Sequence, residues 1–373
     1  MLYVKTLEKT PKGLRDFLNL PYRLYKNDPH WVPPIYEMLL RSLLGDGNPM
    51  MSDEHRFFLA YEDDRPVARV LAGVDTRLTK QLGEKRGYIS LFETEANMEC
   101  ARLVLEAATT YLRELGVECV VGPNASNFHD LNKGLLYEGE EGMPVLSNPY
   151  NPAFYNEYLS AYGFEKHRDY YAYWLNLSDF PAEECKRLGE MAQKRFQFRV
   201  ESVELRPQNL DRIAGEIAQI VDESFSESGE AHKPTKDDIL QEMKNILGYT
   251  APGLIVLAYA GERPIGVFVA LPDYNKLLKP NQGRLFPFGW ATMLFSRKSV
   301  RVARCSILLV SPDYQNKAVS VAMALKAYEN AKKFGIRAVE ASAIDEMDMQ
   351  SILNTERLGA KRYRVYRQYS MKL

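Results

Sequence analysis

The 373-residue sequence lacks the features that mark several specialised classes of protein. No window approaches about 18 uninterrupted apolar residues, and the first residues contain no apolar core of signal-peptide length. The four cysteines form no C-x-x-C pair, and the five histidines show no metal-ligand spacing. We therefore expect no membrane span, no metal, no disulfide framework and a cytoplasmic location.

The sequence also lacks an excess of charge of one sign. Its 48 Lys and Arg stand against 49 Asp and Glu, for a formal net charge of −1. This balance gives no electrostatic reason to expect nucleic acid as a partner. The G-x-S-x-G motif is absent too, which argues against a nucleophilic serine. What remains is an ordinary globular composition with enough length for two or three domains.

An internal repeat is the most informative pattern that is present. Residues 59–75 (LAYEDDRPVARVLAGVD) and 257–273 (LAYAGERPIGVFVALPD) align without a gap. Each copy places two apolar runs around a tight polar turn, which predicts a β-hairpin. In both halves a helix, a strand, a short helix ending in Gly and an aromatic-rich strand follow in the same order. Two copies of one α/β unit explain that order better than chance.

The repeat sets the expected domain organisation. We predict an α/β fold with a mixed sheet in each of two domains, one over residues 1–178 and one over 196–373. A helix over 179–195, which begins with capping, proline and acidic residues, would connect them. The Gly-, Pro- and Asn-rich stretch 122–152 has little periodicity, so we expect a long loop, either functional or simply packed on itself.

A strand, a bend and a helix follow one another in the second half. The apolar run 306–310 predicts a buried strand, 313–317 a polar bend, and 321–331 an apolar stripe at helical spacing. The unpaired N–H groups at such a helix start point the same way and can hold a phosphate.

With the repeat and this bend in hand, the sequence resembles the GNAT acyltransferase superfamily in a tandem arrangement. Segments at 20–34, 87–94, 150–155 and 271–290, with Gly-Pro-Asn at 122–124, match a bacterial subgroup of double-GNAT proteins. The resemblance implies an acyl-CoA or acetyl-CoA co-substrate between two splayed strands, with its pyrophosphate on the bend. The residues that correspond to the binding motif are Leu309, Val310, Gln315, Asn316, Lys317, Ala318, Val319 and Ser320.

The sequence departs from the family at two points. Ala318 and Ser320 replace the glycines of the bend, which puts a Cβ where the backbone approaches a phosphate. The tyrosine acid of many members corresponds to Thr355 in the second half. In the first half it corresponds to Leu159, with Tyr155 close by.

Acidic and hydroxyl residues gather after the main helix of the second half. The resemblance implies that a carboxylate there removes a proton from an amine. The predicted catalytic residues are Glu340, Ser342, Glu346 and Tyr155. Asn124, Tyr150 and Asn151 are predicted to bind the acceptor. Alternatively, Glu346 and Asp348 only charge the first turn of the last helix.

Two further clusters allow more than one interpretation. Arg297, Lys298, Arg301 and Arg304 could contact a phosphate of CoA, an anionic surface or only solvent, with 297, 301 and 304 on one possible helix face. Aromatic residues could wall an acyl pocket or pack in the core, namely Trp31, Phe286, Phe288, Trp290, Tyr170 and Tyr171.

We predict an N-acyltransferase that moves an acyl group from acyl-CoA to the amine of a small molecule or peptide, as a monomer or homodimer. Two alternatives stay open. One is a GNAT-fold binding protein that has lost the chemistry. The other is a Fem-type transferase that uses aminoacyl-tRNA, which the near-neutral charge disfavours.

Overall fold

The computed structural model describes all residues except 125–132, 140, 225–232, 249, 252 and 285–288. The elements of the first half are β1 (Leu2–Leu7), α1 (Arg15–Leu24), α2 (Tyr36–Leu44), η1 (Pro49–Ser52), β2 (His55–Glu62), β3 (Arg65–Val74), α3 (Thr76–Leu82), β4 (Arg86–Thr94), α4 (Met98–Glu114), β5 (Cys119–Asn124), β6 (Leu135–Gly139), α5 (Phe154–Tyr162) and β7 (Glu165–Asn176).

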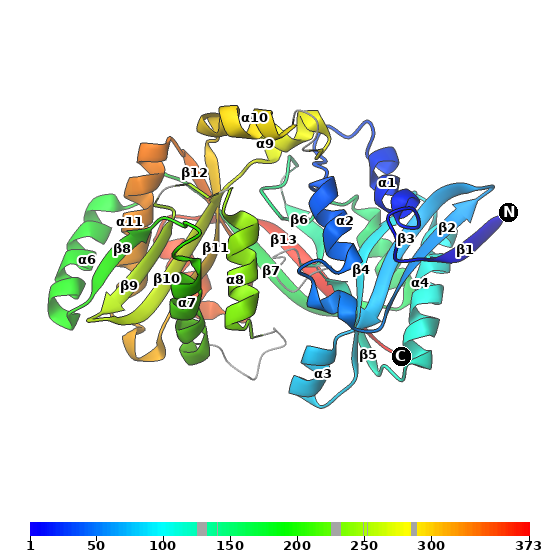
Figure 1. Cartoon of the computed structure of the whole chain (residues 1–373), viewed down its shortest axis with the longest axis horizontal. Helices are drawn as coiled ribbons and strands as arrows, with labels where there is room; N and C mark the ends of the chain where they lie inside the picture. The colour runs from blue at the N-terminus through cyan, green and yellow to red at the C-terminus, as the bar shows by residue number, and fades with distance from the viewer. Residues whose placement is uncertain (125–132, 140, 225–232, 249, 252, 285–288) are drawn as a thin grey trace.

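The second half begins with the connecting helix α6 (Ala182–Phe196) (Figure 1). Its remaining elements are β8 (Arg199–Val203), α7 (Leu210–Ser224), α8 (Lys236–Ile246), β9 (Ile255–Ala260), β10 (Arg263–Pro272), α9 (Asn275–Leu278), η2 (Lys279–Asn281), α10 (Gly289–Ser296), η3 (Arg297–Ser299), β11 (Val302–Val310), η4 (Pro312–Tyr314), α11 (Val319–Phe334), β12 (Ala338–Asp345), α12 (Met349–Arg357) and β13 (Lys361–Lys372). None of the described helices is both long and apolar enough to cross a membrane.

The two repeated hairpins form as predicted. β2 pairs with β3, and β9 pairs with β10, both antiparallel. The turn of the first hairpin places Asp63 and Asp64 at φ values of 47° and 66°, the backbone of a two-residue hairpin turn. In the second hairpin Gly261 adopts φ 59°. Each half is therefore built outward from the same local unit.

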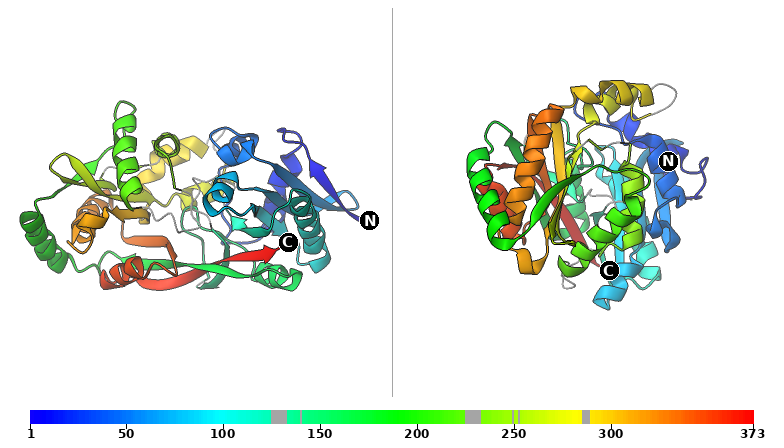
Figure 2. Two further views of the ribbon diagram at one scale, coloured as in Figure 1. Left: turned by 90° about the horizontal axis from the view of Figure 1, so that it is seen from below. Right: turned by 60° about the vertical axis from the view of Figure 1, so that its left-hand side comes forward.

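One mixed sheet runs through both halves in the order β1-β2-β3-β4-β5-β13-β7-β12-β11-β10-β9-β8, with β6 added beside β13. The last strand of each half completes the sheet of the other: β13 pairs with β5, and β7 pairs with β12. These two long strands also pair with each other and cross the junction side by side (Figure 2). This strand exchange joins the halves through backbone hydrogen bonds. The internal repeat in the sequence did not predict it.

The helices predicted from apolar residues at helical spacing pack on the sheet through those residues. In the first half the stripe Ala101, Val104, Leu105 and Ala108 of α4 is buried in the core on β2 and β3. In the second half α11 packs against β10 and also against α6. Gly189 of α6 faces Ala322 of α11 in this contact: a Cβ on Gly189 would lie 3.4 Å from the Cα of Ala322, in ordinary van der Waals contact.

The stretch predicted as a loop after β5 differs in part from that expectation. Residues 135–139 form β6, which pairs with β13, because the exchanged strand offers its backbone groups there. Beyond β6, buried Asn148 and Asn151 face the interior. Residues 144–148 contact the second half, because the carbonyls of Pro144 and Leu146 accept hydrogen bonds from Asn275 and Arg304.

Side chains also connect the halves away from the sheet. Arg77 on α3 forms a two-point ion pair with Asp238 on α8, with N–O distances of 2.8 and 3.2 Å. The Lys279 ammonium donates to the backbone carbonyls of Trp31 at 3.0 Å and of Pro29. The junction is thus bonded at several points.

Candidate active site

The strands β11 and β12 separate after a short paired region. Their parallel ladder joins Val302 to Ala338 and ends where Cys305 pairs with Ala341. β11 continues to Val310 and β12 to Asp345 without further pairing to each other in the described ladder. On its other side β11 stays bonded to β10 as far as Val310. The backbones of the two strands therefore diverge as a V whose apex lies at Cys305 and Ala341.

The bend between β11 and α11 has a left-handed backbone at two residues that are not glycine. Asn316 and Ala318 adopt φ values of 60° and 55° in the left-handed region. Ala318 is the N-cap of the 16-residue α11, and no side chain caps that helix start. The first N–H groups of a helix have no partner inside the helix. The start of α11, where such N–H groups lie, directly follows the bend at the end of β11.

The side chains of the bend leave this backbone accessible. Gln315 and Asn316 are exposed, whereas Ala318 packs its methyl group against the second-half core. The Lys317 ammonium lies over the rings of Tyr314 and Phe196, at 4.5 and 5.5 Å from their centroids. A cation is thus held beside the helix start, where it complements an anion.

A buried carboxylate stands at the apex of the V. Glu340, on β12, is wholly buried and pairs in register with Arg304 on β11. Its Oε1 accepts a hydrogen bond from Nδ2 of Asn148 at 2.5 Å and one from the Ser342 hydroxyl, and its Oε2 accepts one from the Tyr363 hydroxyl. Three donors thus replace the water that a buried carboxylate loses.

Arg304 lies beside this carboxylate and is itself 2% exposed. Its Nη1 donates to the carbonyl of Leu146 at 2.7 Å, and its Nε to the carbonyl of Ser342 at 3.4 Å. Its Nη2 is buried without a hydrogen-bond partner among the described residues. One guanidinium donor is therefore available inside the cluster. The prediction that Arg304 shares a helix face with Arg297 and Arg301 is wrong, because Arg304 lies in the strand β11.

Asp273 brings a second carboxyl to the cluster. Its Oδ1 accepts hydrogen bonds from the backbone N–H groups of Leu146 and Asn275, each at 3.1 Å. Burial and, to a lesser degree, the nearby charge of Glu340 together raise the pKa of Asp273 to about 6, against the opposing effect of the two N–H donors. Shifted carboxyls are characteristic of sites that handle protons.

Of the predicted catalytic residues, the structure brings together only Glu340 and Ser342. Glu346 instead accepts a hydrogen bond from the backbone N–H of Asp169 at 3.0 Å and forms an ion pair with Lys166 at 2.8 Å. It holds the end of β12 to β7. Asp348, rather than Glu346, caps the last helix by accepting the N–H of Ser351 at 3.0 Å.

Tyr155 lies in the first half, at the end of β4. Its hydroxyl accepts the N–H of Thr94 at 2.8 Å and lies 2.9 Å from Oε2 of Glu93. Tyr25 donates to the same oxygen at 2.7 Å, and the buried Arg69 guanidinium is 3.7 Å from Oε1. Burial raises the pKa of Glu93. Glu93 pairs with Arg69 as Leu309 pairs with Val267 in the second copy of the repeat, so this network corresponds to the end of β11 near the bend and not to the apex.

The predicted acceptor-binding residues also have partners within the chain. Asn124 accepts a hydrogen bond from Gln368 on β13. Tyr150 donates to Asp28 at 2.7 Å, and Asn151 exchanges hydrogen bonds with the backbone of Leu136 at 2.7 and 3.2 Å. All three residues lie around the junction, and each forms a hydrogen bond within the chain that fixes its position.

Sequence reasoning missed Asn148, Tyr363 and Asp273. Asn148 and Glu340 are 192 residues apart in the chain, and Tyr363 belongs to the exchanged strand. One signal was available for Asp273, because it ends the second copy of the repeat. Of the aromatic residues proposed for a pocket, Phe286 and Phe288 lie outside the described residues, and Trp290 is half exposed.

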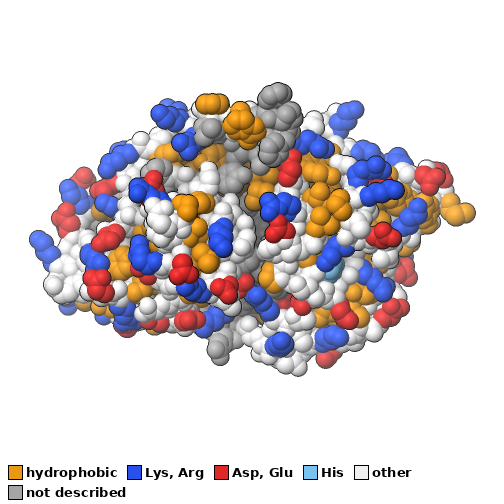
Figure 3. Space-filling model, viewed as in Figure 1, with side chains coloured by type: hydrophobic (Ala, Val, Ile, Leu, Met, Phe, Trp, Pro, Cys, Tyr) orange, Lys and Arg blue, Asp and Glu red, His pale blue; other side chains and the backbone are white. Residues whose placement is uncertain are grey.

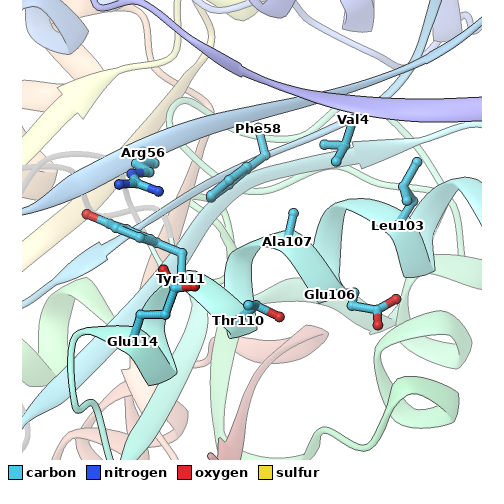
Figure 4. A pocket seen from close by; sticks show the side chains of 9 residues that line it. All are labelled: Val4, Arg56, Phe58, Leu103, Glu106, Ala107, Thr110, Tyr111 and Glu114. Atoms are coloured by element: carbon cyan, nitrogen blue, oxygen red, sulfur yellow. The ribbon is translucent and has the colours of Figure 1, made fainter.

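A pocket of about 290 Å³ lies elsewhere, between β1, β2 and α4 of the first half (Figure 4). Phe58, Leu103 and Tyr111 form much of its wall, and Arg56 lies over the Tyr111 ring at 4.4 Å from the centroid. None of the residues of the bend or of the Glu340 cluster lines it. It is not part of the candidate site.

Comparison with known proteins identifies the architecture. No protein-family model matches the chain. Two curated relatives are similar over nearly their full length. Protein YghO of Escherichia coli (strain K12) is 28% identical over 379 residues, with 96% of this chain and 93% of that protein covered. Bacterial ceramide synthase of Caulobacter vibrioides (strain NA1000 / CB15N) is 27% identical over 378 residues, with 98% and 96% covered.

Among solved structures, a tandem GNAT protein from the clavulanic acid biosynthesis pathway superposes on the whole chain. The match has a TM-score of 0.63 at 12% identity and covers 98% of that protein. Its extent across both halves confirms the predicted pair of GNAT-like units and the α/β fold class.

Proposed function

We propose that this chain, which has the tandem GNAT fold, transfers an acyl group from acyl-CoA to an amine at the apex of β11 and β12. The observation that carries the proposal is one continuous arrangement in the second half. An open V between two strands leads from a helix start with free N–H groups to a buried carboxylate. In the first half, the bonded Glu93–Tyr155 network lies at the strand end that corresponds to Leu309 and Val310.

The residues along β11 and the bend fit both the pyrophosphate and the pantetheine of acyl-CoA. The pyrophosphate would rest on the N–H groups at the start of α11, with Lys317 beside it. The pantetheine would occupy the V, where β11 has lost its partner β12. The Ala318 methyl packs against the core, so it does not project toward the phosphate. The inward methyl group supports phosphate binding at a bend that lacks the glycine.

Glu340 is proposed as the general base. An amine must be neutral to attack a thioester carbonyl, and Glu340 would take its proton as the C–N bond forms. The C–S bond then breaks, and the CoA thiolate accepts the proton that Glu340 took from the amine, so that CoA leaves as the thiol and Glu340 is ionised again. The Asn148 amide shows the approach, because its nitrogen already donates to Oε1 of Glu340 at 2.5 Å. An acceptor amine would displace Asn148 from that position.

Ser342, Tyr363 and Arg304 support this step. The Ser342 and Tyr363 hydroxyls hold the Glu340 carboxylate in one orientation. The available Nη2 donor of Arg304 is placed to stabilise the negative charge that develops on the thioester oxygen. Glu346 and Tyr155 have no part in the proposed step, because each is bonded elsewhere.

The acceptor is proposed to be a long-chain amine. A ceramide is an amide between a fatty acyl group and the amine of a long-chain base. The similarity to Bacterial ceramide synthase extends over 98% of this chain. An acceptor of that class would be one of the two substrates of an N-acylation, which is the chemistry that the Glu340 cluster supports.

Turnover by matched variants tests the proposal. The protein is incubated with a long-chain acyl-CoA and sphinganine as the probe amine, and both free thiol and amide are measured. We expect equal amounts of both, and a loss of about 10² to 10⁴ in rate for Glu340→Gln. Glu346→Gln is the control and should retain activity. Saturable acyl-CoA binding with no amide from any amine would instead show a GNAT-fold binding protein that has lost the chemistry.

A further inference from the structure

A long segment of the second half has a composition unlike the rest of the chain. Between Asp273 and Asp313 the sequence contains seven Lys and Arg and no Asp or Glu, although acids make up 49 of the 373 residues. The segment comprises α9, α10, η3 and most of β11. Its local charge is strongly positive in a protein whose net charge is −1.

The cations at the surface of this segment have no acidic partners. Arg284, Arg297, Lys298 and Arg301 are exposed, and none forms an ion pair with a described carboxylate. Elsewhere on the surface ion pairs are common: Arg263, for example, contacts both Glu223 and Asp313. Unpaired cations grouped on one side create a field that attracts an anionic surface.

Exposed apolar side chains lie among these cations. The helix α10, GWATMLFS, contains no charged residue. On it Phe295 is 79% exposed and Trp290 is 50% exposed. Figure 3 shows hydrophobic side chains over α9 and α10 at the edge of the molecule, with Lys and Arg side chains beside them. An apolar helix flanked by basic residues has the composition of a helix that lies in a membrane interface.

The shape of the molecule allows a flat surface to reach this segment. α9 and α10 form a ridge that stands out at one edge in two different views (Figures 1 and 2). Lys279 fastens the ridge to the first half through the carbonyls of Pro29 and Trp31. The ridge is therefore a supported, outward-facing edge.

We propose that this basic-apolar ridge, comprising Arg284, Trp290, Phe295, Arg297, Lys298 and Arg301, docks the protein on the surface of a bilayer rich in anionic lipid. Trp290 and Phe295 enter the interface, and the four cations contact lipid phosphates. The four cations favour an anionic bilayer over a neutral protein partner, because each cation near an anionic membrane surface contributes to binding. The inference is independent of the proposed acyl transfer and requires only the folded chain.

A second apolar surface provides the contrast. Met349, on α12, is 57% exposed but lies next to the acidic residues Glu346 and Asp348 in the chain. An anionic surface would repel that neighbourhood. Replacing Met349 with Glu is therefore a matched control for replacing Phe295 with Glu. Lys332→Glu with Lys333→Glu, at the exposed last turn of α11, is the matched control for reversing Arg297 and Lys298.

Vesicle flotation of the full chain tests the proposal. Vesicles of phosphatidylcholine with about 30% phosphatidylglycerol should bind the protein, and pure phosphatidylcholine should bind it at least about tenfold less. Raising the salt from about 0.1 M to about 0.5 M should release it. Phe295→Glu, and Arg297→Glu with Lys298→Glu, should each lower binding about tenfold or more.

The control variants distinguish the ridge from a general effect. Met349→Glu and the Lys332/Lys333 reversal should bind vesicles like the unaltered protein. Thermal unfolding checks that all variants are folded. No binding to anionic vesicles, or equal losses in ridge and control variants, would overturn the proposal. Binding to heparin without binding to vesicles would overturn it as well, by assigning the cations to a polyanion in solution.

Discussion

Replacing Asp273 by Asn tests the charge balance of the buried cluster. Burial raises the pKa of this carboxyl from 3.8 to about 6. The folded protein thus holds the proton more tightly than the unfolded chain does. The stability that this proton contributes is present below about pH 4 and is lost as the pH rises through 6. A shift of about two pKa units corresponds to about 3 kcal/mol.

The Asp273→Asn variant keeps the acceptor oxygen that receives the N–H groups of Leu146 and Asn275, but it carries no charge. The difference in unfolding free energy, variant minus unaltered protein, should therefore be about 3 kcal/mol larger at about pH 8 than at about pH 4. Urea unfolding at both pH values measures this difference. Asp46→Asn, at an exposed ion pair, is the control and should show little change. Equal effects of Asp273→Asn at both pH values would refute the assignment.

Three further substitutions test the junction and the donor site. Arg77→Ala removes the ion-pair partner of Asp238, whose pKa Arg77 and the Thr235 donors together lower to about 2, and should cost about 1 to 2 kcal/mol in urea unfolding at neutral pH because the Thr235 donors remain. The stability from this ion pair is present above about pH 3.8 and is lost as the pH falls toward 2. The control is Arg41→Ala, at an exposed ion pair, which should cost under about 1 kcal/mol. Similar costs for the two variants would contradict a buried contact at the junction. Lys317→Ala should weaken CoA binding about tenfold in calorimetry, whereas Lys332→Ala at the far end of α11 should not. Ala318→Gly should leave the CoA dissociation constant within about twofold, because the methyl packs inward; a large gain in affinity would show that it obstructs the phosphate.

The elements of the fold were predictable because their signals are local. A hairpin is encoded by two alternating runs and a turn, and the repeat supplied that signal twice. The helix stripe over α11 and the bend before it are also contained within about 30 residues. The exchange of β7 and β13 is different. Both strands are aromatic-rich and flanked by the same elements, so the sequence does not state which sheet each one completes.

The site was predictable only where its residues share one strand. Glu340 and Ser342 are two positions apart on β12 and therefore point to the same face. Asn148 and Tyr363 reach Glu340 from the junction segment and from the exchanged strand, so their contribution depends on the tertiary fold. Arg304 matched a helical spacing with Arg297 and Arg301, but β11 begins at Val302 and buries it. Spacing alone could not distinguish the two environments.

The central claim is that acyl-CoA binds between β11 and β12 with its reactive end at Glu340. A crystal structure with a thioether analogue of a long-chain acyl-CoA tests it most directly. The account predicts the pyrophosphate on the backbone N–H groups of the bend, Asn316 to Ser320. It predicts the carbonyl carbon near Glu340, with Asn148 withdrawn from that carboxylate. An analogue bound in the first half, beside Glu93 and Tyr155 or in the pocket on α4, would contradict the account.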